Sequence, residues 1–182
     1  MRKQLKRWCS LLLTLVMVVS LLPTAVFAAD PEPATWTKVA LADIAETDTV
    51  AITMTNANGD KTWVLPTTGK GSKKQPLATE VTVKDNTLTT GGSDGFGWTI
   101  AATEGGYHIK TGSSYLYLTA ANNGMRIGKT ISVWSLSTDN YLTAKDSNDD
   151  SRYLGVYHGT DWRCYTNTTG NIAGQTLGFW KL

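Results

Sequence analysis

A short phrase that occurs three times constrains this sequence more than any other feature. It reads Trp98-Thr99-Ile100, then Trp134-Ser135-Leu136, then Trp180-Lys181-Leu182. In each copy an apolar residue stands on either side of a polar one, so the tryptophan and the aliphatic residue share one face of a β-strand. The copies begin 36 and 46 residues apart, which is the period of a supersecondary repeat. The phrase predicts three equivalent strands in a threefold β-structure.

Short alternating segments separated by turn clusters fill the chain around these phrases. The second and third units align: Tyr115-Leu116 falls on Tyr153-Leu154, and Met125-Arg126-Ile127 falls on Trp162-Arg163-Cys164. No such unit can bury its apolar face alone, so the units are expected to pack together. The other segments that we expect to be strands are residues 49–53, 61–65, 78–83, 87–90, 107–110, 115–118, 125–127, 141–144, 152–157, 162–165 and 177–182.

Three units, at about residues 47–100, 101–136 and 137–182, predict an all-β domain with the β-trefoil fold. In that fold three pseudo-repeats form a closed six-stranded barrel capped by hairpins, and closure removes exposed strand edges. Residues 29–46 are expected to form a leader and a first strand. A two-sheet β-sandwich is the alternative, since it also has many short strands. The trefoil is favoured because a sandwich gives no reason for the repeated tryptophan phrase.

Residues 1–28 have the pattern of a signal peptide. Arg2, Lys3, Lys6 and Arg7 precede an apolar run at residues 11–22, and Val26-Phe27-Ala28 offers small residues for cleavage. The run is shorter than the roughly 20 apolar residues of a membrane span. We therefore expect a secreted, extracellular protein without a membrane anchor after cleavage.

Cleavage would also change the charge and the cysteine count. Four of the 17 Lys and Arg residues lie in residues 1–28, which leaves 13 against 15 acidic residues, a net charge of −2. A weakly acidic surface argues against nucleic-acid binding. Cys164 would be the only remaining cysteine, so no internal disulfide is possible, and its place in an alternating strand predicts burial. We expect a monomer.

The C-terminal third carries a family resemblance, in Arg152-Tyr-Leu-Gly-Val-Tyr, Asp161-Trp-Arg-Cys-Tyr-Thr-Asn and Gln175-Thr-Leu-Gly-Phe-Trp. These stretches resemble an accessory β-domain of exported multidomain proteins from anaerobic gut bacteria. There the domain lies beside nuclease, phosphoesterase or surface-attachment regions. The resemblance implies a non-catalytic module and provides no site residues.

The expected architecture is also similar to that of ricin-type lectin trefoils, which stack sugars on aromatic residues. Their Gln-x-Trp repeat is absent, because Phe96, Ser132 and Gly178 stand where that repeat has glutamine. The similarity therefore concerns the fold alone.

Several local motifs are better explained as ordinary loops. Leu65-Pro66-Thr67-Thr68-Gly69 spells a sortase signal but lies in the middle of the chain. Asp146-Ser-Asn148-Asp-Asp150 matches the start of a calcium loop, but Ser151 and Tyr157 replace its glycine and its closing glutamate. We expect a solvated hairpin turn there, and we predict no metal, cofactor or catalytic residue.

The best candidate for ligand contact is the stretch with Tyr157, His158, Asp161, Trp162 and Arg163. Aromatic faces beside Asp and Arg can stack on a sugar ring and bond to its hydroxyl groups. The alternative is structural: Trp162 aligns with Met125 and is then a core residue, and the others are then surface turn residues.

These observations predict a non-enzymatic binding module whose partner is an extracellular glycan or cell-surface material. One alternative is a protein-binding module such as a protease inhibitor, with the loops at residues 66–76 and 166–175 as contacts. Another is an unrecognised hydrolase, which requires His108 or His158 beside an acid.

Overall fold

The computed structural model describes residues 32–182, apart from residues 72 and 94. This part of the chain contains fourteen β-strands and one 3-10 turn, η1 (Leu41–Asp43), and no α-helix. The predicted all-β class is confirmed. The expected signal peptide, residues 1–28, lies outside the described residues.

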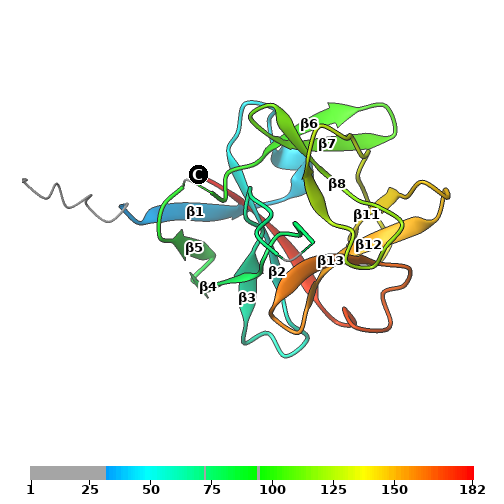
Figure 1. Cartoon of the computed structure of the whole chain (residues 1–182). Coiled ribbons are helices and arrows are strands. Elements are labelled where there is room, and N and C mark those ends of the chain that lie inside the picture. Colours follow the sequence, from blue (N-terminus) through cyan, green and yellow to red (C-terminus); the bar gives the residue numbers. More distant parts are fainter. Residues whose placement is uncertain (1–31, 72, 94) are drawn as a thin grey trace, which may run out of the picture. The chain divides into compact units, whose positions relative to one another are not determined.

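Six antiparallel strands form a closed barrel, in the order β1, β14, β2, β3, β4 and β5 (Figure 1). The barrel closes because β1 pairs with β14 on one edge and with β5 on the other. Its two hairpins, β2–β3 and β4–β5, are formed by consecutive segments that the sequence predicted to be strands. The strands are β1 (Ala34–Val39), β2 (Val50–Thr55), β3 (Thr62–Val64), β4 (Thr79–Lys84), β5 (Thr87–Thr90) and β14 (Thr176–Lys181).

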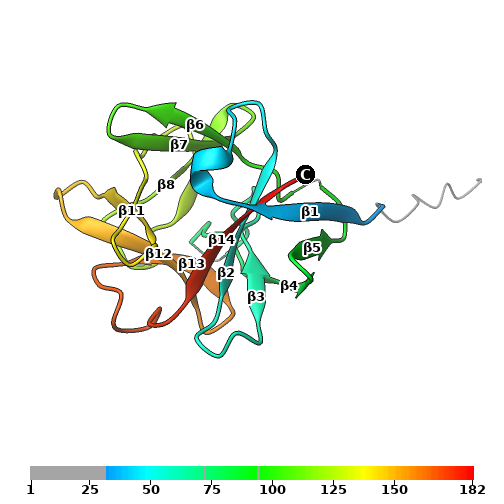
Figure 2. The ribbon, with the colours of Figure 1, turned by 180° about the vertical axis from the view of Figure 1, so that it is seen from behind.

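The middle of the chain forms two further sheets of four antiparallel strands each (Figure 2). One contains β6 (Thr99–Thr103), β7 (Gly106–Thr111), β8 (Ser114–Tyr117) and β9 (Arg126–Gly128). The other contains β10 (Ser135–Leu136), β11 (Leu142–Lys145), β12 (Ser151–Tyr157) and β13 (Asp161–Tyr165). Segments 76–78 and 160–162 join β13 to the barrel, through the bridge between Leu77 and Asp161.

Strand alternation divides the buried side chains between two cores. The small core contains Trp36, Ala51, Val64, Leu88 and Trp180. The larger core combines residues of β2, β3 and β14 with residues of both four-stranded sheets. Successive residues point to opposite faces of a strand, so Phe179 packs in the large core and Trp180 in the small one. Burial of each large apolar side chain contributes about 1.5–3 kcal/mol to stability.

Two of the three repeated tryptophans have the same environment. Trp98 and Trp134 are fully buried, and each indole nitrogen donates a 3.0 Å hydrogen bond to a leucine carbonyl, that of Leu65 or of Leu116. Each tryptophan also forms an isolated antiparallel bridge, to Val50 or to Tyr107. This part of the predicted equivalence holds.

The third tryptophan does not fit the prediction. Trp180 lies within β14, which is paired on both edges, and its indole nitrogen donates to Oγ1 of Thr53 at 2.7 Å. The aliphatic residue also differs between the copies, since Ile100 is buried whereas Leu136 is 40% and Leu182 53% exposed. A three-residue pattern specifies which residues share a face but not which face is covered.

Candidate functional site

Four of the five predicted site residues lie at the closed end of the β12–β13 hairpin, where Tyr157 pairs with Asp161. The turn is tight: the amide of Thr160 donates to the carbonyl of Tyr157 at 2.8 Å. Residues 158–160 connect the two strands, and His158 and Gly159 have φ angles of +46° and +71°. Two successive positive φ values match the right-handed twist of the flanking strands.

Trp162 is not part of that surface. Its side chain is fully buried in the large core, and its indole nitrogen donates to the carbonyl of Val64 at 3.3 Å. Trp162 and Cys164 share the inner face of β13, while Asp161 and Arg163 lie on the other face because side chains alternate. The structure therefore places Trp162 in the core, as the structural alternative expected, and leaves none of its side chain exposed at the surface.

Asp161 holds neighbouring segments together. Its carboxylate accepts a 2.6 Å hydrogen bond from Nε of Arg163 and a 2.9 Å bond from Nε2 of Gln75. The Arg163 guanidinium in turn lies 3.8 Å from the centre of the Tyr157 ring. The hydrogen bond to Asp161 raises the pKa of the Arg163 guanidinium. These contacts fix the loop at residues 66–76 on the hairpin.

The loop at residues 166–175 is anchored on the same hairpin. The Gln175 side chain accepts from the amide of Val156 at 2.9 Å and donates to its carbonyl at 2.7 Å. Tyr141 Oη also donates to the carbonyl of Ile172 at 2.7 Å. Gly155 allows this approach, because a Cβ there would lie 2.2 Å from Cγ2 of Ile172.

A pocket of about 400 Å³ lies where the β2–β3 hairpin, the β12–β13 turn and the loop at residues 166–175 meet. Among the predicted site residues, His158 lines this pocket. We call it the Trp63 pocket, and its lining residues are Asn56, Lys61, Trp63, Glu80, His158, Gly159, Asn171 and Gln175.

Trp63 has an unused hydrogen-bond donor. Its side chain is only 7% exposed, yet its indole N–H has no acceptor in the described part of the chain. The other described tryptophans all donate, namely Trp36, Trp98, Trp134, Trp162 and Trp180. A Cβ on Gly159 would lie 3.0 Å from Cζ2 and 3.4 Å from Nε1 of Trp63, so this edge of the indole adjoins the pocket lining. The buried side-chain atoms that lack a partner in the described part of the chain are Thr143 Oγ1 and Tyr165 Oη, so the Trp63 N–H keeps contact with solvent and is accessible to an acceptor from a ligand.

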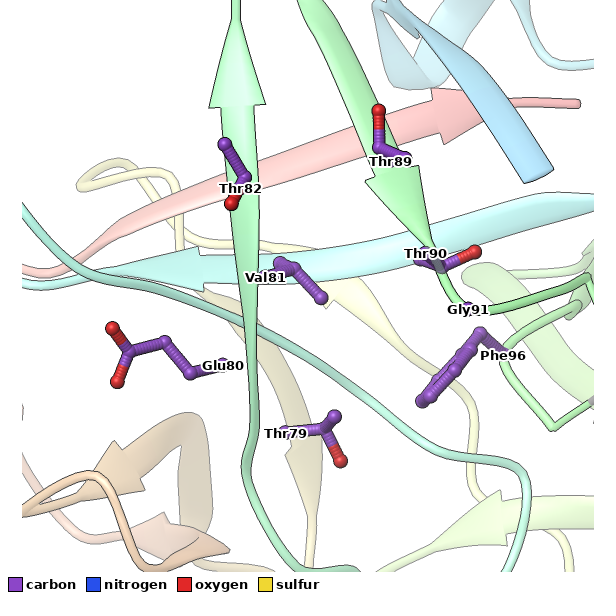
Figure 3. A pocket seen from close by; sticks show the side chains of 8 residues that line it. All are labelled: Thr79, Glu80, Val81, Thr82, Thr89, Thr90, Gly91 and Phe96. Atoms are coloured by element: carbon purple, nitrogen blue, oxygen red, sulfur yellow. The ribbon is translucent and has the colours of Figure 1, made fainter. Parts of the chain in front are cut away.

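Glu80 places a carboxylate beside this donor, because it pairs directly with Trp63 across β3 and β4. The Glu80 side chain points away from Thr79, Val81 and Phe96, to the other side of β4 (Figure 3). The Lys61 ammonium lies 3.8 Å from Oε2 of Glu80, and both side chains are more than half exposed. Such an ion pair contributes at most about 1 kcal/mol.

Two other hollows offer less specific chemistry. One, of about 270 Å³, has threonine hydroxyl groups and Phe96 in its lining (Figure 3). Its Thr90 hydroxyl is already occupied, since it accepts from Trp36 and donates to the carbonyl of Gly92. The other, of about 380 Å³, lies beside the exposed side chains of Ile131 and Val133. The first hollow shares Glu80 with the Trp63 pocket, and the second has the buried Thr143 hydroxyl, which is unpaired among the described residues, but neither has an indole N–H in its described lining.

The calcium-like turn connects β11 to β12, and its first residue, Asp146, is buried rather than solvated. The Asp146 carboxylate accepts from the amides of Asn148 and Asp150, and from Nε of Arg152 at 2.8 Å. Burial acts to raise the pKa of Asp146, but these hydrogen bonds lower it below its ordinary value. Arg152 also reaches the carbonyl of Ala120, which ties this hairpin to the preceding loop. Within residues 32–182, as described, no three acidic, histidine or cysteine side chains gather into a possible metal site.

The pocket could not be found from local spacing, because its lining comes from five separate stretches of the chain. Sequence reasoning missed Trp63 because it lies just before the sortase-like motif, in a strand whose pattern indicates a buried core strand.

No helix among the described residues has the length and apolar character needed to cross a membrane. Comparisons with protein families, with curated proteins and with solved structures gave no match to this chain.

Proposed function

We propose that this domain is a non-catalytic module that binds a glycan in the Trp63 pocket. The observation that carries the proposal is the indole N–H of Trp63, which lies in a mostly buried side chain at the pocket and has no acceptor among the described residues. Sugar-binding sites combine an apolar or aromatic surface with a few fixed polar groups. Here the polar groups are the amides of Asn56, Asn171 and Gln175.

The pocket lining favours binding over cleavage. Glycoside hydrolysis generally requires a pair of carboxylates that flank the scissile bond. Glu80 is the single acidic residue in the described lining, and none of the lining residues is a serine, threonine or cysteine nucleophile. The anchored loop at residues 166–175 supports a preformed site, which lowers the entropic cost of binding.

The proposal also includes where the domain acts, which is outside the cell. We infer a secreted monomer that binds extracellular or cell-surface glycan, and the signal-like pattern of residues 1–28 supports its secretion. The resemblance of the C-terminal third to an accessory domain of exported proteins supports such a role.

We also propose the β-trefoil as the finer description of the fold. The shared environment of Trp98 and Trp134 and a common core supplied by all three units support it. The β-sandwich is consistent with the same antiparallel strands, and Trp180 departs from threefold symmetry. An experimental structure tests the trefoil: a rotation of about a third of a turn must superpose the three units.

A glycan array followed by calorimetry tests the function, with Trp63→Phe as the main variant. Phenylalanine keeps an aromatic ring and removes the N–H, so we expect about a tenfold loss of affinity from one hydrogen bond. Trp98→Phe is the control, because its indole bonds to Leu65 within the core. The proposal fails when no glycan binds the full chain, or when Trp63→Phe binds as tightly as the parent.

A further inference from the structure

We propose that the Trp63 pocket selects neutral sugars through two adjacent hydroxyl groups, which donate to the Glu80 carboxylate while the Trp63 N–H donates to a sugar oxygen. This inference rests on the proposed glycan-binding function and names its substrate class and its principal acceptor.

The alternation of hydrogen-bonded and non-hydrogen-bonded residue pairs between the barrel strands brings the side chains of Trp63 and Glu80 together. The amide of Leu65 donates to Ile52, and the amide of Asn56 donates to Lys61. These bonds fix the alternation between β2 and β3, so the main-chain groups of Trp63 point toward β2. Trp63 and Glu80 are therefore a non-hydrogen-bonded pair of β3 and β4, the kind whose Cα atoms lie only about 4.5 Å apart.

The Glu80 carboxylate is free to accept hydrogen bonds from a ligand. Its described ion pair is the 3.8 Å contact with Lys61, and the two side chains are 59% and 53% exposed. A carboxylate has two oxygen atoms and about four lone-pair directions, which match two neighbouring O–H donors. Sugar hydroxyl groups on adjacent ring carbons present this geometry.

The amide groups around the pocket complement such a ligand with donors. Gln175 uses one N–H for the Val156 carbonyl, and Asn56 uses one for the Asp60 carboxylate. Each amide nitrogen carries two hydrogens, so each keeps one N–H without an acceptor in the described part of the chain. The carbonyl oxygen of each amide is already occupied by main-chain amides. These side chains therefore act as donors to ring and hydroxyl oxygens.

The charges disfavour an acidic sugar. Glu80 and Lys61 are the one acidic and the one Lys or Arg residue of the described lining, and their opposite charges cancel. A ligand carboxylate bonded to the Trp63 N–H would lie next to the Glu80 carboxylate, because the two residues are direct cross-strand neighbours. Like charges at that separation repel, and the exposed Lys61 offers little compensation.

The test compares neutral methyl hexosides and their oligosaccharides with the corresponding hexuronic acids, by calorimetry on the full chain. Glu80→Gln is the main variant and Glu46→Gln the matched control, since Glu46 is also an exposed carboxylate in an ion pair, with Lys110 at 3.9 Å, and does not line the pocket. We expect the parent to prefer the neutral sugars. Glu80→Gln is expected to lose about tenfold or more in affinity, as for a charge-assisted hydrogen bond, and Glu46→Gln to stay within about twofold. Circular dichroism checks that both variants fold.

The outcomes separate this inference from the function on which it rests. Binding of no sugar of either class overturns the glycan-binding function itself. Binding that needs Trp63 but persists in Glu80→Gln overturns only the role of Glu80. A preference for hexuronic acids overturns the neutral class.

Discussion

Gly159→Ala tests the contact between the β12–β13 turn and Trp63. Gly159 has a φ angle of +71°, and an added Cβ would lie 3.0 Å from Cζ2 of the indole. Alanine in this left-handed region costs about 1–2 kcal/mol. Overpacking against a buried ring costs a further 1–3 kcal/mol or so. We expect a combined loss of about 2–5 kcal/mol in the free energy of unfolding.

Gly112→Ala is the matched control. Gly112 also has a positive φ angle, +52°, but an added Cβ there meets nothing within 4 Å. The control is therefore expected to lose only the backbone contribution, about 1–2 kcal/mol. Urea denaturation followed by tryptophan fluorescence measures both variants. The difference between them isolates the contact with Trp63.

Affinity provides a second readout for the same variant. A displaced indole moves the Trp63 N–H relative to Glu80, so Gly159→Ala should bind glycan more weakly while Gly112→Ala binds as the parent does. Equal stability losses in the two variants, together with unchanged affinity, would refute the packing of Gly159 against Trp63.

Two further predictions concern ionisable groups. Burial raises the pKa of Tyr165 from 10.0 to about 12. The neutral phenol therefore stabilises the fold fully below pH 10, and this contribution is lost as the pH rises to about 12. Tyr165→Phe should shift alkaline unfolding to higher pH, measured by circular dichroism, and an unchanged midpoint would contradict this. Burial also raises the pKa of the Cys164 thiol, so in a Cys9→Ser background a thiol reagent should label the native protein far more slowly than the urea-unfolded protein. Equal labelling rates would show that the thiol is accessible.

Alternation and turn chemistry were sufficient to predict the local elements. The hairpin with the Asp85-Asn86 turn is an example, because both residues have positive φ angles and asparagine and aspartate tolerate them. The burial of Cys164 also follows from its place in an alternating strand. Such features depend on residues that are neighbours along the chain.

The rest depends on long-range pairing, which short patterns do not encode. The Trp-x-Leu phrase at Trp180 looks like the one at Trp134, yet β14 is inserted between β1 and β2 and directs this indole into the barrel. Asp161 looked like a ligand contact, but Gln75, 86 residues away, takes one of its oxygens. Trp63, on which the proposed site depends, lines a pocket with the turn at Gly159, which long-range pairing brings against it.

The indole N–H resonance of Trp63 provides the most direct test of the binding site. In a ¹⁵N–¹H correlation spectrum of the full chain, Trp63→Phe identifies this resonance among those of the seven tryptophans. Titration with a glycan that binds should shift the Trp63 signal, while the signals of Trp98 and Trp134 stay in place because their N–H groups already donate to Leu65 and Leu116. A glycan that binds and leaves the Trp63 signal unmoved would contradict the assignment of this pocket.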